Sequence, residues 1–265
     1  MTTPVVLMEK DERGVATVRI NRPEVNNAYN GEMIDALIDG VGTLGKDEDV
    51  RVIVLRGNGR HFQAGADLNW VAGMSELSEA ENIKASQKTT DVIRFLDACP
   101  KPTIGLIHGG CFGGGTGVAA ACDIVIASLD AIFSIAEVRW GLAAGPIIPQ
   151  LNAAMGVRNV RRYALTGERF DATQAWELGL VHEVCDEGEL DETAAPIIDS
   201  LLKNGPGAIA ETKRIVFETA GLEIDDELAQ ILSEAHGTRR MSAEATEGLA
   251  SFREKREANW YPGPA

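Results

Sequence analysis

Residues 101–117 read KPTIGLIHGGCFGGGTG, an apolar run that passes directly into a glycine-rich stretch. Residues 101–108 predict a strand after a proline-marked turn, residues 109–117 a glycine loop, and residues 118–122 a short helix of small side chains. Glycine lets a ligand approach the backbone, and the free N–H groups at a following helix start favour negative charge. The stretch therefore indicates either a ligand-binding loop or a tight turn between strand and helix.

A second loop of the same kind lies earlier in the chain. Residues 61–68 read HFQAGADL and follow residues 50–55 (VRVIVL), a β-branched run that predicts a buried strand. Two such loops, each giving one N–H, could hold a developing oxyanion. Neither matches a nucleotide fingerprint, because the chain has no G-x-x-x-x-G-K-[ST] and its glycine run does not open a chain-initial βαβ unit.

The order of the remaining patterns predicts an α/β fold with parallel strand pairing. Further strands are expected at residues 15–20, 123–128 and 131–135, and Asn30 is expected to cap a helix. Other helices are expected at residues 76–98, 157–165, 172–178, 190–203, 207–220 and 227–256. The strand-rich part should end near residue 150, and Gly205-Pro206-Gly207 marks the boundary between a core domain of residues 1–204 and a C-terminal helical region of residues 205–265.

Composition excludes several classes of protein. The 265 residues include 40 acidic and 25 basic side chains, a net charge of −15, which argues against a nucleic-acid surface. The longest apolar stretch, near residues 113–121, is too short for a membrane span, and the first residues lack the pattern of a signal peptide, so a cytoplasmic protein is expected. Four cysteines without CxxC spacing predict buried, reduced thiols, and no His, Cys or Asp set has metal-ligand spacing.

Several motifs occur in a fixed order along almost the whole chain. They are residues 21–23 (NRP), 62–68 (FQAGADL), 112–117 (FGGGTG), 121–124 (ACDI), 133–137 (FSIAE), 164–172 (ALTGERFDA) and 252–256 (FREKR). Together they resemble the crotonase (enoyl-CoA hydratase/isomerase) superfamily. The resemblance implies a spiral of ββα turns with a helical C-terminal oligomerisation region, a homotrimer or a dimer of trimers, and an acyl-CoA substrate with no further cofactor.

The resemblance also implies roles for individual residues. The backbone N–H groups of Ala64 and Gly114 match the oxyanion hole that stabilises a thioester enolate. The positions that match the coenzyme A site are Val25, Asn26, Ala28, Ala66, Asp67, Leu68, Phe252 and Lys255. In the family the last two lie in a tail helix that often closes the pocket of a neighbouring subunit.

Glu137 matches a glutamate that moves a proton at the substrate α-carbon. An apolar pocket raises the pKa of a carboxylate, which lets it act as acid or base near neutrality. Trp70, Gly117 and Trp140 are the residues expected to line the acyl pocket around it.

The sequence departs from the family at Gly117, where two-glutamate hydratases carry their second glutamate. A finer resemblance of residues 67–70 (DLNW) and 137–142 (EVRWGL) points to a bacterial subgroup that hydrates 3-methylglutaconyl-CoA and isohexenylglutaconyl-CoA in leucine and acyclic-terpene breakdown. The hypothesis is that Gly117 leaves room for a branch at C3. Glu137 or backbone groups of residues 141–145 would then place the water, and Arg139 or His108 would meet the distal carboxylate.

These observations predict a hydro-lyase that adds water across the 2,3-double bond of a branched enoyl-CoA. Two alternatives stay open at this point. A Δ3-Δ2 enoyl-CoA isomerase needs only one glutamate, and a catalytically weak acyl-CoA binder would need none.

Overall fold

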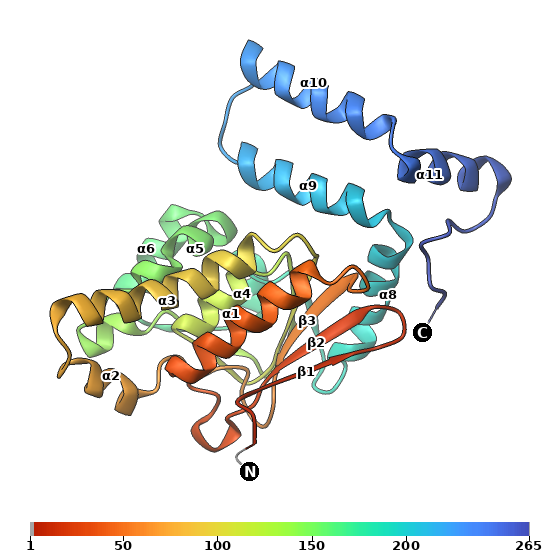
Figure 1. Cartoon of the computed structure of the whole chain (residues 1–265). Helices are drawn as coiled ribbons and strands as arrows, with labels where there is room; N and C mark the ends of the chain where they lie inside the picture. Colours follow the sequence, from red (N-terminus) through yellow and green to blue (C-terminus); the bar gives the residue numbers. More distant parts are fainter. Residues whose placement is uncertain (1–2, 265) are drawn as a thin grey trace.

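The computed structural model describes residues 3–264, which build two sheets, a layer of helices on each side and a C-terminal arm (Figure 1). The larger sheet has the strand order β1-β2-β3-β4-β6-β9, in which only the β1–β2 pair is antiparallel. Its strands are β1 (Val6–Lys10), β2 (Val15–Ile20), β3 (Val52–Gly57), β4 (Thr103–Ile107), β6 (Ile124–Ser128) and β9 (Glu183–Cys185). The predicted α/β class is confirmed, although β9 and the short β8 (Arg169–Asp171) lie beyond residue 150, where no strand was expected.

Strand β3 shows why the sheet is covered on both faces. Its side chains alternate between the two faces, so Ile53 and Leu55 enter one apolar cluster while Val52 and Val54 enter another. A strand that is apolar at every position must be buried on both sides. The continuous apolar run of residues 52–55 therefore places β3 in the interior of the sheet.

Helices α1 (Gly31–Lys46) and α3 (Glu79–Asp97) pack together on one face of this sheet. The Asn30 side chain accepts a hydrogen bond from Met33 N, which confirms it as the cap of α1, and Ser78 with Glu81 forms a capping box that begins α3. On the opposite face, α8 (Leu190–Lys203) buries Leu190, Ala194 and Leu202. Helix α2 (Leu68–Met74), which the sequence did not predict, precedes α3.

The smaller sheet carries the glycine stretch. It consists of β5 (Gly110–Phe112), β7 (Ile132–Ser134) and β8 (Arg169–Asp171), with β7 in the middle. Helix α4 (Gly114–Ala120) begins directly after β5. The expected loop of residues 109–117 therefore has a glycine with positive φ on each side of a short strand, Gly109 at +55° and Gly113 at +52°. The first residues of a helix, predicted to start only at residue 118, come next.

The remaining helices lead from the core into the arm. They are η1 (Pro23–Val25), η2 (Glu137–Trp140), η3 (Gly145–Ile147), α5 (Ile148–Met155), α6 (Val157–Thr166), α7 (Ala172–Glu177), α9 (Pro206–Thr219), α10 (Asp226–Arg240) and α11 (Ala243–Glu254). The single helix expected over residues 227–256 is two helices, because Ser242 caps α11 and interrupts the run. Figure 1 shows α9, α10 and α11, in blue, standing away from the sheet, and the division at residues 204 and 205 stays a prediction.

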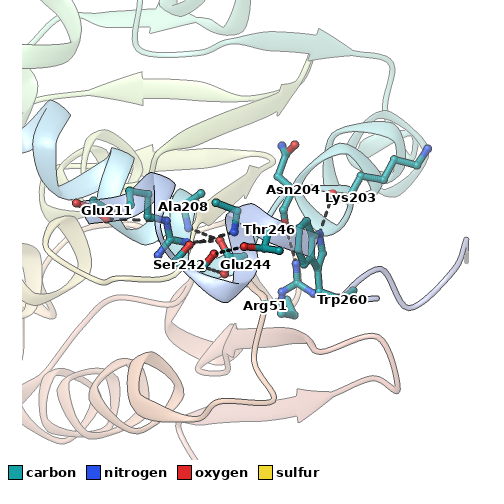
Figure 2. Close-up of polar contacts among 12 residues, drawn as sticks. Arg51, Lys203, Asn204, Ala208, Glu211, Ser242, Glu244, Thr246 and Trp260 are labelled. Atoms are coloured by element: carbon teal, nitrogen blue, oxygen red, sulfur yellow. Dashed lines mark hydrogen bonds and ion pairs between the residues drawn. The ribbon is translucent and has the colours of Figure 1, made fainter. Parts of the chain in front are cut away.

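Polar contacts hold the junction between α8 and the arm, and further contacts lie within the arm itself (Figure 2). The Arg51 guanidinium donates to the carbonyls of Leu202, Asn204 and Trp260 at 2.7–3.1 Å. The Glu244 carboxylate accepts from the N–H groups of Gly207 and Ala208 at the start of α9, at 2.9 and 2.8 Å. These bonds satisfy carbonyls at the end of α8 and N–H groups at the start of α9 that have no partner within their own helix.

Two further predictions concern the whole chain. All four cysteines are buried and free, as expected. Within residues 3–264, no helix has the length and apolar character needed to cross a membrane.

Candidate functional site

The two loops singled out in the sequence lie side by side. Gln63 and Cys111 form a parallel bridge, in which Gln63 N donates to Gly110 O at 3.1 Å and Phe112 N to Gln63 O at 2.9 Å. Gly65 adopts φ +84°, and a Cβ there would lie 3.2 Å from Phe112 O. Glycine at this position therefore permits both the turn and the close approach of the two loops.

The pairing decides which N–H groups are free to bind a ligand. Ala64 N donates to Asn26 O at 3.0 Å, so the predicted oxyanion role of Ala64 is wrong: its donor is already used. Within residues 3–264, neither Ala66 N nor Gly114 N donates a hydrogen bond to another group of the protein. Ala66 and Gly114 follow Gly65 and Gly113, and a Cβ on Gly65 would lie 4.0 Å from the Gly113 Cα. The two free donors therefore belong to adjoining segments.

Glu137 is the first residue of η2 and places its carboxylate over Gly113. A Cβ on Gly113 would lie 2.9 Å from Glu137 Oε1, so only glycine leaves this space. Glu137 Oε2 is buried and has no hydrogen-bond partner in residues 3–264. Burial raises the pKa of this carboxyl above its ordinary value, because the charged form is desolvated. The site thus holds a carboxyl group with a raised pKa beside two N–H donors that make no hydrogen bond within residues 3–264.

A cavity of about 370 Å³ opens in front of these groups, between α1, α2, α3 and the segment that follows η2. Its wall includes Met33, Leu37, Trp70, Val71, Met74, Val92, Ile93, Trp140, Leu142 and Ile147. Trp70 and Trp140 line it as predicted. Within residues 3–264, no Lys, Arg or His lines the cavity, and Glu137 is its single carboxylate. The cavity suits an apolar chain that leads to the carboxylate.

Gly117 does not line the cavity, and the prediction that it leaves room for a branched substrate is wrong. A Cβ on Gly117 would overlap Ile147 Cγ2 and lie 2.6 Å from Ile147 Cβ. The space that a side chain would need is filled by Ile147, which is itself 3% exposed. Glycine is present here because a helix and the η3 segment pack closely.

The two cations expected to meet a distal carboxylate lie elsewhere. His108 Nε2 contacts Gly59 O at 2.9 Å, and the Arg139 side chain lies against Gly167. Neither belongs to the cavity wall. This part of the hypothesis is wrong for the structure.

The predicted coenzyme A residues divide into three groups. Ala66 and Leu68 line the cavity. Asp67 caps α2 and pairs with Arg22 at 3.0 Å, which gives it a structural role beside any contact with a ligand. Val25, Asn26 and Ala28 lie in and after η1, next to the 61–68 loop but outside the cavity wall. Contact of these residues with coenzyme A stays a prediction.

Phe252 and Lys255 lie at the end of α11, on the arm and away from α2 and α3 (Figure 1). Phe252 is 83% exposed, and neither residue lines the cavity of its own chain. Their predicted contribution to the pocket of a neighbouring subunit stays a prediction.

Two polar residues of the cavity were missed in the sequence. The Tyr29 ring lies on Gly114, and a Cβ on that glycine would lie 2.6 Å from Tyr29 Cε1. Gln63 is 1% exposed, and its Oε1 has no partner in residues 3–264. The available signal was that Gln63 lies inside the motif of residues 62–68 and that Tyr29 follows the motif of residues 21–23, and neither position shows where a side chain points.

Comparison with known proteins places this site in a family. Residues 10–262 match the family model described as enoyl-CoA hydratase/isomerase. The chain belongs to the enoyl-CoA hydratase/isomerase family. Its similarity to a short-chain-enoyl-CoA hydratase of Clostridium acetobutylicum is 32% identity over 258 residues, covering 97% of each chain. A crystal structure of an enoyl-CoA hydratase from Shewanella pealeana has a TM-score of 0.93 and 36% identity, covering 97% of this chain and 96% of that one.

The family contains more than one activity. A peroxisomal Δ(3,5)-Δ(2,4)-dienoyl-CoA isomerase of Arabidopsis thaliana is also 32% identical over 234 residues, with 84% of each chain covered. Hydratases and isomerases are therefore about equally similar to this chain. Membership confirms the crotonase fold and the hydratase/isomerase type of enzyme, and the choice between the two reactions depends on the site itself.

Proposed function

We propose that this protein is an enoyl-CoA hydratase that adds water across the 2,3-double bond of an uncharged acyl thioester, with coenzyme A present only as part of the substrate. The observation that carries the proposal is the buried, unpartnered carboxylate of Glu137 beside the free N–H groups of Ala66 and Gly114. All three lie at the cavity wall.

The two N–H groups would hold the thioester oxygen. Attack of water at C3 moves an electron pair through C2 onto that oxygen, and fixed donors stabilise the resulting enolate. Removing one such donor from other enzymes costs about 3–4 kcal/mol of transition-state stabilisation. Ala66 replaces Ala64 in this role, because the Ala64 N–H is already bonded to Asn26 O.

Glu137 would then act twice. Its carboxylate accepts a proton from the water as the oxygen bonds to C3, and the carboxylic acid returns that proton to C2 as the enolate collapses. Water is thereby divided between C3 and C2, and no other reagent is consumed. The raised pKa suits this exchange, because acid and base forms are then closer in free energy at neutral pH.

The cavity favours an uncharged acyl group. A glutaconyl chain carries a second carboxylate, and burying a charge without a partner is strongly unfavourable. Within residues 3–264, no cation of the cavity wall could pair with it. We therefore propose a straight or branched hydrocarbon chain in place of the 3-methylglutaconyl and isohexenylglutaconyl groups that the sequence suggested, and with it no assignment to leucine or terpene breakdown.

An isomerase is the second candidate, and the single carboxylate favours it. Moving a double bond from position 3 to position 2 transfers one proton between C2 and C4, which one base can do. The same oxyanion donors would stabilise the same kind of enolate. The two reactions differ in that a hydratase adds water at C3, whereas an isomerase moves a proton from C2 to C4 and adds no water.

The test is turnover of purified protein on crotonyl-CoA, trans-2-decenoyl-CoA, 3-methylglutaconyl-CoA and a 3-enoyl-CoA. Liquid chromatography separates isomers of equal mass, and mass spectrometry detects the gain of water. Gain of one water on the uncharged 2-enoyl substrates supports the proposal. Conversion of the 3-enoyl thioester with no hydration of any 2-enoyl substrate would establish the isomerase.

Glu137→Gln separates an enzyme from an acyl-CoA binder. For an enzyme we expect turnover to fall by about 10³-fold or more while affinity for a saturated acyl-CoA changes little. Equal turnover of wild type and variant would remove Glu137 from the mechanism.

We also propose that the arm joins subunits into a trimer or a dimer of trimers. Its helices expose large apolar side chains, which are Val216, Phe217, Ile231, Met241, Leu249 and Phe252. Exposed apolar groups gathered on one region are typical of a protein contact. Light scattering on the purified chain tests this, and a monomer would contradict it.

A further inference from the structure

Tyr29 is held rigidly at the wall of the cavity. Its N–H donates to Gly65 O at 2.8 Å and its carbonyl accepts from Asp67 N at 2.9 Å, so its backbone is bonded on both sides to the loop that carries Ala66. Its ring meets Trp70 edge to face, with ring centroids 5.8 Å apart. The next residue, Asn30, caps α1. A side chain fixed at this many points is preorganised.

One edge of the Tyr29 ring lies on the glycine that follows the one under Glu137. A Cβ on Gly114 would lie 2.6 Å from Tyr29 Cε1 and 3.4 Å from Cζ, the atom that carries the hydroxyl, while a Cβ on Gly113 would lie 2.9 Å from Glu137 Oε1. Consecutive Cα atoms are about 3.8 Å apart. The Tyr29 ring and the Glu137 carboxylate therefore lie over adjoining glycines, and both residues line the cavity.

The Tyr29 hydroxyl stays protonated at neutral pH. Burial, together with the nearby charge of Glu137, raises the pKa of Tyr29 to about 12. Within residues 3–264 its hydroxyl makes no hydrogen bond. The polar cavity residues Asn82 and Thr89, in contrast, donate to the carbonyls of Met74 in α2 and Ala85 in α3, respectively. A phenol in this state can donate one hydrogen bond and accept another.

We propose that Tyr29 is a water-positioning residue, whose hydroxyl holds the water that Glu137 deprotonates. The inference rests on the proposed hydratase function. This role of Tyr29 explains how one carboxylate is enough to hydrate the substrate. The phenol supplies the second polar contact to the water, which a side chain at position 117 could not supply because Ile147 fills the space there. Tyr29 neither gains nor loses a proton overall. It orients the water oxygen toward C3 while the proton passes to Glu137.

The variant Tyr29→Phe keeps the ring on Gly114 and against Trp70 and removes only the hydroxyl. Two rates are measured for it and for the wild type. The first is hydration of trans-2-decenoyl-CoA, and the second is exchange of the C2 protons of decanoyl-CoA in D₂O, followed by mass. Exchange needs the carboxylate and the oxyanion donors but no attacking water. Tyr163→Phe, at a buried tyrosine packed on Phe170 outside the cavity wall, is the matched control.

We expect Tyr29→Phe to lower kcat for hydration by about tenfold or more, from the loss of one hydrogen bond in the transition state, with KM and the exchange rate within about twofold of wild type. Hydration at the wild-type rate would overturn the proposal, and an equal fall in both rates would show a merely structural role and overturn it too. A wild type that exchanges C2 protons but hydrates no enoyl-CoA would refute the hydratase function and the water-holding role with it.

Discussion

The close packing of Gly117 under Ile147 gives a quantitative prediction. In Gly117→Ala, the new methyl group would overlap Ile147 Cγ2 and lie 2.6 Å from its Cβ. Overpacking of a well-filled core costs about 1–3 kcal/mol. Against this, exchanging glycine for alanine inside a helix gains about 0.5–1 kcal/mol. We therefore expect a net loss in the free energy of unfolding.

Gly42→Ala is the matched control, because Gly42 lies inside α1 and nothing is within 4 Å of a Cβ built on it. Gly42→Ala should gain only the stability that comes from exchanging glycine for alanine inside a helix, about 0.5–1 kcal/mol. The difference between the two variants then isolates the overpacking cost, about 1–3 kcal/mol. Urea unfolding of both, at one protomer concentration, measures it. Equal stabilities for the two variants would refute the packing explanation of Gly117.

A double-mutant cycle identifies the colliding group. Ile147→Ala removes Cγ2 and leaves Cβ, so adding Gly117→Ala in that background should cost less than in the wild type. Contacting residues commonly show a coupling of about 0.5–3 kcal/mol. A coupling near zero would mean that the added methyl group is accommodated by other movements.

Three further predictions follow from single residues. Glu137→Gln should be as stable as the wild type near pH 4 and more stable than it at pH 8, as measured by urea unfolding. Burial raises the pKa of Glu137 in the folded protein above its ordinary value of 4.5, so the wild-type carboxyl is neutral at low pH and becomes a destabilising buried charge as the pH rises through the folded-state pKa. A stability difference that widens toward acid would contradict this. Asn27→Ala should cost about 2–4 kcal/mol, because it removes a fully buried amide with three hydrogen bonds at φ +58°; urea unfolding measures the loss, and unchanged stability would contradict it. Arg51→Ala should make the chain more sensitive to proteolysis between α8 and α9, since three carbonyls lose their donor; an unchanged cleavage rate would show that the arm is held by other contacts.

The sequence predicted the elements whose signals are local. Asn30 caps its helix because an Asn side chain reaches the N–H three residues on, and residues 52–55 form a central strand because every side chain is apolar. The break at Ser242 was missed because the helical spacing of apolar residues continues across it. Helix α2 was missed because its seven residues are too few to show a period.

The sequence motifs predicted part of the site correctly. Glu137 and Gly114 were placed correctly at the cavity, but Ala64 was chosen where the structure favours Ala66. The two alanines stand two residues apart in one loop, and the difference between them is the bond from Ala64 N to Asn26 O. A contact between segments nearly forty residues apart cannot be read from either segment alone.

The glycine stretch illustrates the same limit. In sequence, the glycines at 113, 114, 115 and 117 look like one flexible loop, whereas each makes space for a different side chain: Glu137, Tyr29, Gln63 and Ile147, respectively. Three of these bring polar atoms to the cavity wall and the fourth closes it with an apolar group. The effect of a mutation in this stretch should therefore depend on the side chain that the mutated glycine contacts. A mutation at Gly117 should lower stability, and one at Gly113 should impair proton transfer by Glu137. The glycines contribute no reactive side chain of their own. The chemical groups at this stretch belong to the residues for which the glycines leave space, and these residues come from three other parts of the chain.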